Sequence, residues 1–264
     1  MDYVELTWTD LLLSLTFILL ALGLAYWQRI DIKRDMSIGT IRTFVQLIAV
    51  GYILEWLFNI RNVVVILAIL LMMIAVASWE GTNRPTMHIP HLYPILYFSI
   101  TVTTAIVVGM TFAFIIPVNP LNRMDYFVPL AGILIGNALN GAALTADRLA
   151  SEIQQRRLEI ESALALGAST GDAINLSFRM AVKAAMIPSI NSLMTVGIVH
   201  LPGIMVGQIL AGTPPIQAIR YQIIIMYMLI STKAIGSIIT GMLVYREFFT
   251  SRHQLKIGLL QQGE

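Results

Sequence analysis

The chain has 264 residues, of which 57% are apolar and only 12% are charged, about half the charged share of an ordinary soluble domain. So few charges do not cover a soluble globule of this size, and the high apolar content excludes intrinsic disorder. The formal net charge of +2 identifies no partner, and the absence of cysteine excludes disulfides, Cys-bound zinc and iron–sulfur clusters. Because the apolar residues lie in long runs, the sequence predicts an all-α, polytopic membrane protein.

Seven apolar stretches are long enough to cross a bilayer, at about residues 8–28, 38–58, 62–79, 94–116, 127–147, 181–200 and 217–245. The first stretch follows acidic residues, Asp2 and Glu5, where a signal peptide has a basic region, so we interpret it as a retained helix. Short loops with Pro and Gly separate most of the stretches. We expect a single transmembrane domain of about seven helices over residues 1–264.

The positions of the basic residues predict the orientation. Seven crossings place thirteen Lys and Arg residues on one side: Arg29, Lys33, Arg34, Arg42, Arg84, Arg148, Arg156, Arg157, Arg179, Lys183, Arg246, Arg252 and Lys256. The other side holds Arg61 and Arg123, with Arg220 at the start of the last stretch. The positive-inside rule then places the N-terminus outside and the C-terminus in the cytoplasm.

The segment 148–183 is polar, basic and predicted to be cytoplasmic. Residues 148–166 contain neither Gly nor Pro and repeat apolar residues at helical spacing, so we expect the fifth spanning helix to continue to Leu166. Gly167 suits the positive-φ position that ends a helix. A second helix then begins near Ser169, Thr170 or Asp172 and continues through Lys183. The segment is predicted to form a helix, an elbow and a second helix.

The elbow has the sequence ESALALGAS over residues 161–169, and Ile187-Pro188 follow later. This pattern of Glu161, Ala163, Ala165 and Gly167 resembles the EAA loop of ATP-binding-cassette (ABC) permeases. The resemblance implies that Glu161, Ala163 and Gly167 belong to a coupling helix that docks on a cytoplasmic ATPase. The distance from Gly167 to Pro188 is longer than is usual for importers. The alternative is an amphipathic helical hairpin that lies on the membrane surface.

Three further segments carry a wider resemblance: GNALNGAAL at 136–144, MIPSINSLM at 186–194 and LPGIMVGQILAG at 201–212. They are similar to a family of small bacterial ABC permeases assigned to iron export, whose plant relatives are linked to aluminium tolerance. The likeness covers essentially the whole chain. It implies a permease domain in the bacterial cytoplasmic membrane, a separate ABC ATPase subunit, a permease homodimer in membrane lipid, and a role in metal homeostasis. It implies no nucleic-acid partner and no bound cofactor.

Polar residues within the apolar stretches are candidates for the translocation path. Lys233 lies near the middle of the last stretch and, with Ser237 and Gly241, forms a stripe along one helix face. It either lines the path, pairs with a carboxylate such as Asp147 or Glu55, or extends along its own stem to the membrane interface.

The other candidates for the path are Asn137, Asn140, Pro188, Asn191 and Glu80. Small residues and Asn in a spanning helix also serve simple helix packing, so Asn137 and Asn140 have a structural alternative. Pro188 either interrupts its helix at a binding site or only kinks it. Glu80 lies at the cytoplasmic end of the third stretch, where it is placed to contact a cation. The metal ligands stay unknown: the His88/His91 spacing contains Pro90, His200 is isolated, and the fourteen Met residues suit packing as well as soft ions.

The predicted function is that of a permease subunit without a catalytic site. The chain has no P-loop sequence, so ATP hydrolysis is expected in a partner subunit. An ABC importer for another small solute and an ion-coupled secondary transporter are the alternatives. An intramembrane enzyme is disfavoured because HExxH and Gly-x-Ser-x-Gly motifs are absent.

Overall fold

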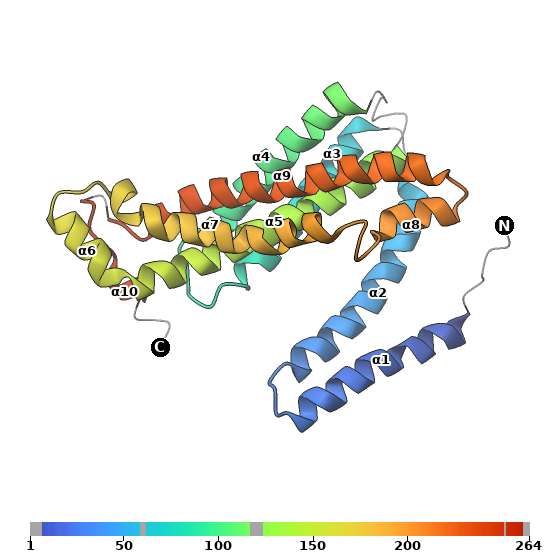
Figure 1. Ribbon diagram of the computed structural model, residues 1–264, viewed down its shortest axis with the longest axis horizontal. Coiled ribbons are helices and arrows are strands. Elements are labelled where there is room, and N and C mark those ends of the chain that lie inside the picture. The colour runs from blue at the N-terminus through green and yellow to red at the C-terminus, as the bar shows by residue number, and fades with distance from the viewer. Residues whose placement is uncertain (1–6, 59–61, 117–123, 251, 261–264) are drawn as a thin grey trace. The chain divides into compact units, whose positions relative to one another are not determined.

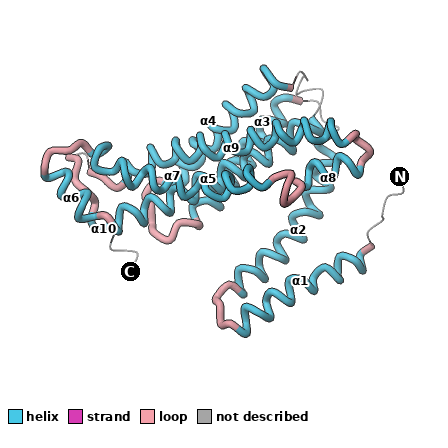
Figure 2. The backbone as a smooth tube through the Cα atoms, in the orientation of Figure 1, coloured by secondary structure: helices cyan, strands magenta, loops and turns pink. Residues whose placement is uncertain are grey.

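The computed structural model describes residues 7–58, 62–116, 124–250 and 252–260, and the regular elements in these ranges are helices. The chain divides into two compact units, Met1–Arg61 and Asn62–Glu264. The all-α fold predicted from the apolar runs is confirmed (Figure 2). The expectation of one permease domain over the whole chain stays a prediction.

The first unit is a hairpin of two helices, α1 (Trp8–Trp27) and α2 (Lys33–Phe58), which contact each other. The backbone N–H of Thr7 donates to Asp10 Oδ2 at 2.8 Å, which satisfies one of the free donors at the start of α1. Most large apolar side chains of α1 are exposed, for example Phe17 and Leu20. Helices with so much exposed apolar surface fit a lipid environment better than water.

The second unit is a helical bundle built around α5 (Met124–Gln155). This helix packs against α3 (Val63–Thr82), α4 (Leu92–Met110), α7 (Thr170–Thr195) and α9 (Pro215–Glu247), as Figure 1 shows. A π-helical turn, η1 (Thr111–Ile115), prolongs α4. Ala138, Ala142 and Ala146 are fully buried at four-residue spacing. Small side chains on one face let neighbouring helix backbones approach closely, which is how spanning helices associate in lipid.

Among the described residues, six helices are long and apolar enough to cross a membrane: Trp8–Trp27, Lys33–Ile53, Val63–Thr82, Leu92–Ile115, Tyr126–Gln155 and Pro215–Glu247. They correspond to six of the seven stretches predicted from the sequence. The chain is therefore a multi-pass membrane protein in its architecture. The count of seven crossings and the orientation of the two termini stay predictions.

The stretch predicted at 181–200 differs most from the structure. α7 begins at Thr170, so the expected second helix of the elbow and the expected sixth span are one helix. This helix continues past Pro188, whose side chain is exposed, and ends at Thr195. A proline ring on the outer side of a helix removes one hydrogen bond without ending the helix. The interpretation of Pro188 as a break in the helix is thus wrong.

The expected single helix from Arg148 to Leu166 is also wrong, because it is interrupted at Arg156, where φ is −103° and ψ is 19°. α5 ends at Gln155 and α6 (Arg157–Ala165) begins in a new direction and packs on α7. The Arg156 guanidinium pairs with Glu159 and lies 3.6 Å from Met180 Sδ on α7. The chain thus changes direction at a position that has contacts with α7 but no Gly or Pro.

Two short helices appear in segments that were expected to be loop or tail. α8 (Gly203–Leu210) follows Pro202 and is closed by Gly212, which has a positive φ of 92°. α10 (Ile257–Leu260) lies in the C-terminal tail, where Leu260 is buried and its carbonyl accepts from Gln154 Nε2 at 3.1 Å. The C-terminal tail is therefore hydrogen-bonded to the end of α5, close to the turn into α6.

Candidate functional site: a helical elbow and a buried polar seam

The elbow between α6 and α7 is a helix end closed by glycine. Gly167 has φ of +90°, as its sequence position predicted. Its N–H donates to Leu164 O at 3.0 Å, and the N–H of Ala168 donates to Ala163 O at 3.0 Å. These two bonds form a Schellman motif, which satisfies the last carbonyls of α6. Ala163 thus contributes to the elbow through its backbone, and its side chain is half-buried.

α7 begins directly after this motif. The Ser169 hydroxyl accepts from the backbone N–H of Asp172 at 3.2 Å and donates to Asp172 Oδ2 at 2.6 Å. Of the three N-cap candidates in the sequence, the structure uses Ser169. Hydrogen bonds on both sides of Gly167 therefore fix the angle between α6 and α7.

The surface of the elbow combines charge with exposed apolar side chains. Glu161 is half-buried and accepts from Arg157 Nε at 3.0 Å, so its carboxylate lies along α6. Leu158 is 75% exposed and Leu166 is 89% exposed. Large apolar side chains that protrude from a short polar helix are typical of a surface that a partner covers. These two leucines were not among the predicted site residues, although large apolar residues in an otherwise polar segment were the available signal.

A second candidate site lies where α4, α5 and α9 pack together. Lys233 of α9 is 7% exposed, and its stem lies against Gly141 of α5. A Cβ atom at Gly141 would lie 2.7 Å from Lys233 Cγ, 3.0 Å from the Lys233 carbonyl oxygen and 3.0 Å from Ser237 Oγ. The glycine therefore makes the space into which the lysine stem packs.

Buried hydroxyl groups accompany this lysine on all three helices. Six have side-chain oxygens without a hydrogen-bond partner in the described residues, and one of them, Thr104, lines a pocket against α3. The other five are Ser99 and Thr103 of α4, Thr145 of α5, and Ser237 and Thr240 of α9. Together with Lys233, these residues are called the polar seam below. Buried hydroxyls without partners are uncommon, and each one is able to bind a passing ligand or water.

Asp147, one of the two carboxylates considered as a partner for Lys233, binds a different residue. Asp147 Oδ1 accepts from the backbone N–H of Thr86 at 2.9 Å and from the Thr86 hydroxyl at 3.1 Å. Asp147 therefore holds the α3–α4 loop, and its proposed pairing with Lys233 is wrong. The side chain of Glu55 lies outside the described residues. In the described part of the chain, Lys233 forms no ion pair.

The two asparagines of α5 connect helices. The Asn137 amide donates to the carbonyl oxygen of Leu229 on α9. Asn140 is exposed, and its Oδ1 accepts from Arg84 Nη1 at 2.6 Å. These contacts favour the packing role that the sequence left open for both residues.

The remaining candidates are not among the residues of the polar seam. Pro188 and Asn191 are exposed on α7, and Glu80 is half-buried near the end of α3. His91 Nδ1 lies 3.1 Å from Glu247 Oε2, so it joins the start of α4 to the end of α9. In the described ranges, no three His, Asp or Glu side chains gather where they would hold a metal ion.

Comparison with known proteins gives the family. Residues 8–249 match the uncharacterised protein family UPF0014. The chain belongs to the UPF0014 family. It is 37% identical to the UPF0014 membrane protein slr1647 of Synechocystis, over 96% of this chain and 98% of the relative. It is 32% identical to the probable iron export permease protein FetB of Escherichia coli, over 98% of each chain.

A plant relative is also similar over most of its length. The protein ALUMINUM SENSITIVE 3 of Arabidopsis thaliana is 32% identical, over 92% of this chain and 88% of the relative. The resemblance drawn from the sequence motifs, to an iron-export family with aluminium-related plant members, is thus confirmed. No solved structure matches the chain.

Proposed function

We propose that this UPF0014 protein is the membrane-spanning permease subunit of an ABC transporter that exports a metal ion, with iron as the substrate. A separate cytoplasmic ATPase hydrolyses the ATP, and two permease copies form a homodimer in the bacterial cytoplasmic membrane. The permease itself contributes no catalytic residue. The printed name of the Escherichia coli relative, a probable iron export permease, supports the substrate and the direction.

The elbow is the observation that carries the proposal. It protrudes from the bundle between α5 and α7 (Figure 1), and hydrogen bonds on both sides of Gly167 fix its geometry. Its exposed leucines, Leu158 and Leu166, are suited to insertion into a groove of a partner. Because α7 continues from the elbow into the bundle and the short helix α6 joins the elbow to α5, a force on the elbow acts on two long helices at once. This is the arrangement that a subunit driven by a separate ATPase requires.

The polar seam supports transport more than enzymatic chemistry. It offers one buried ammonium group and several hydroxyls, but it holds no carboxylate or imidazole to act as a general base. A buried lysine repels a bare cation, so we propose that Lys233 acts beside the path, where it sets the electrostatic potential that the ion meets.

The test begins with co-expression of the permease with a P-loop ATPase encoded by a neighbouring gene. We expect the two to co-purify, and we expect ATP hydrolysis in liposomes to rise with ferrous iron. An ABC importer for another solute would keep the ATPase but would show no response to iron. An ion-coupled secondary transporter would transport without any ATPase.

Two variants test the elbow within this complex. Gly167→Val places a β-branched side chain at a positive φ, and Glu161→Ala removes the carboxylate of the elbow. Both are expected to reach the membrane at normal levels, to bind less ATPase and to lose transport. The matched control is Gly171→Ala, because Gly171 lies in the first turn of α7, next to the elbow, with only Ser169 Oγ near its Cβ position, at 3.8 Å. Wild-type ATPase binding and transport in both variants would refute the coupling role and favour a hairpin on the membrane surface.

A further inference from the structure

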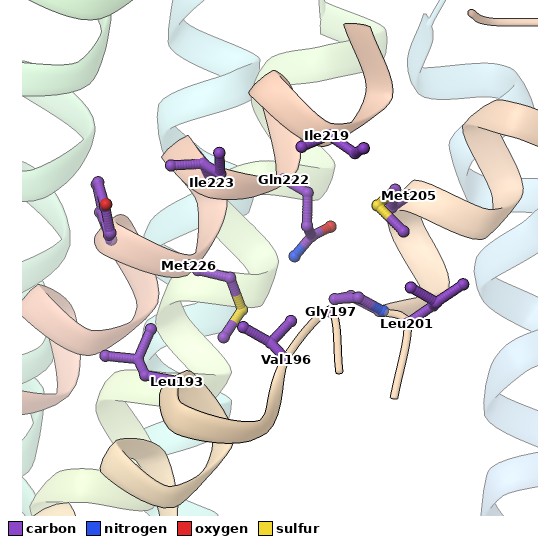
Figure 3. Close-up of a pocket in the computed structure, with 11 residues that line it drawn as sticks. Leu193, Val196, Gly197, Leu201, Met205, Ile219, Gln222, Ile223 and Met226 are labelled. Atoms are coloured by element: carbon purple, nitrogen blue, oxygen red, sulfur yellow. The ribbon is translucent and has the colours of Figure 1, made fainter. Parts of the chain in front are cut away.

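A cavity of about 370 Å³ lies at the end of the bundle opposite the elbow. The end of α7, the turn at residues 196–202, α8 and the first half of α9 line it (Figure 3). Most of the lining is aliphatic, for example Leu193, Val196 and Ile223. Nothing in the permease function described above uses this cavity.

Two lining side chains carry a polar group, Gln222 and Tyr227, and of these Tyr227 is exposed whereas Gln222 is buried. Gln222 is 95% buried, since only 5% of its surface is exposed, and its Oε1 has no hydrogen-bond partner in the described residues. Figure 3 shows its amide between the thioethers of Met205 and Met226. Leaving a buried amide oxygen without a partner is unfavourable, so such a group usually has a ligand or water that satisfies it.

The lining restricts the chemistry of the occupant. None of the lining residues is charged, so an ionic ligand would lose its hydration without gaining a counter-ion. The two thioethers suit a soft metal ion, but a single ion would leave most of the 370 Å³ unfilled. An apolar body fills the space and buries the aliphatic wall from water. A hydroxyl group suits the amide particularly well, because it is both a donor and an acceptor.

We propose that this cavity binds an uncharged, mainly apolar molecule whose hydroxyl or amide group hydrogen-bonds to Gln222. This chemistry belongs to neutral hydroxylated lipids of the membrane and also to apolar alcohols taken from solution. The inference is independent of the proposed transport of iron, because it rests on the cavity and on the unpartnered amide alone.

The test is photolabelling of the full-length protein in nanodiscs with a diazirine-bearing decanol. The attached positions are mapped by mass spectrometry. We expect labels on segments 193–205 and 219–227, and we expect the alcohol to half-saturate these segments at about a tenfold lower concentration than the matching decane probe. Labels on the lipid-exposed helix α1 give the background for both probes. A diazirine-bearing decanoate, which is charged, is expected to label the cavity at background level.

Two variants separate the amide from the space around it. Gln222→Leu keeps the volume but removes the hydrogen bond, so the preference for the alcohol over the alkane is expected to disappear. Val196→Phe fills the cavity, so labelling by both probes is expected to fall to background. Equal labelling by alcohol and alkane in the wild type, or unchanged alcohol preference in Gln222→Leu, would overturn the proposal.

Extraction of the purified protein distinguishes the two sources of the occupant. A neutral hydroxylated lipid that co-purifies with the wild type and is absent from Gln222→Leu identifies the membrane as the source. Specific labelling by the alcohol without any co-purified lipid identifies a molecule taken from solution.

Discussion

A substitution at Gly141 tests whether α5 and α9 are packed as closely as the structure shows. A Cβ atom at this position would lie 2.7 Å from Lys233 Cγ and 3.0 Å from the Lys233 carbonyl oxygen. The lysine side chain can turn away, but the carbonyl belongs to the backbone of α9 and moves only with the helix. Gly141→Ala is therefore expected to separate the two helices locally. Overpacking of this kind typically destabilises a protein by about 1–3 kcal/mol.

Gly136 provides a matched control on the same helix, because a Cβ atom there meets no atom within 4 Å. Ala is favoured over Gly within a helix by about 0.5–1 kcal/mol, and this gain applies to both variants. Gly136→Ala is expected to be neutral or slightly stabilising. Gly141→Ala is expected to be less stable than this control by roughly 1–3 kcal/mol, which for a chain of this size lowers the midpoint of thermal unfolding by several degrees.

The measurement is thermal unfolding of both variants and the wild type in the same detergent, at one heating rate, because unfolding of such proteins is often irreversible. The reasoning is refuted if Gly141→Ala unfolds at the same temperature as Gly136→Ala. Equal midpoints would mean that α9 moves freely against α5 and that the Lys233 stem is not confined by Gly141.

Three further predictions concern the elbow, the polar seam and the topology. Gly167→Val is expected to destabilise the elbow by about 1–2 kcal/mol, whereas Gly167→Asn is expected to be tolerated at the positive φ. Limited proteolysis should therefore cleave the Val variant faster than the Asn variant. Equal rates of cleavage would exclude backbone strain at this position. Lys233→Met is expected to impair transport but to keep the ATPase bound, and full transport would place Lys233 outside the mechanism. Because the C-terminus is predicted to be cytoplasmic, alkaline phosphatase fused after residue 262 should be inactive, and a reporter that works only in the cytoplasm should be active there. The reverse result would refute the seven-crossing topology.

The spanning helices were predictable because each consists of a long apolar run, and a bilayer leaves such a run few alternatives to a helix. The elbow was predictable for a different reason. A positive φ is inexpensive only for glycine, so Gly167 after a helical pattern determines where α6 ends, and Ser169 is a strong N-cap. In both cases the signal is local and needs no knowledge of distant contacts.

The turn at Arg156 was not predictable from the local sequence, because it involves no Gly or Pro. At this turn, Arg156 contacts Met180 on α7, and the side chain of Gln154 donates a hydrogen bond to the Leu260 carbonyl in α10. These partners lie 24 and 106 residues away along the chain. A pattern within one helix does not contain such information.

The environment of Lys233 was only partly predictable. The sequence showed a lysine within an apolar run but left open whether its side chain lies inside the protein or extends to the membrane interface, and in the structure the residue is buried. It did not show which carboxylate lies nearby, and Asp147 proved to bind the α3–α4 loop through Thr86. It also did not show that Thr103 of α4 and Thr145 of α5 belong to the same interface, since that depends on how three helices rotate about their axes.

The proposed coupling has a physical route through α5. This single helix carries Gly141 in its middle and ends at Gln155, where α6 begins and leads to the elbow. Fourteen residues separate the two, or about 21 Å of helix at 1.5 Å per residue. The contact between Gly141 and Lys233 has no flexible side-chain end on the α5 side, so a rotation or shift of α5 is passed to the backbone of α9 rather than absorbed by rotamers. If the ATPase moves the elbow, the polar seam must therefore change its shape, because α5 forms one wall of it.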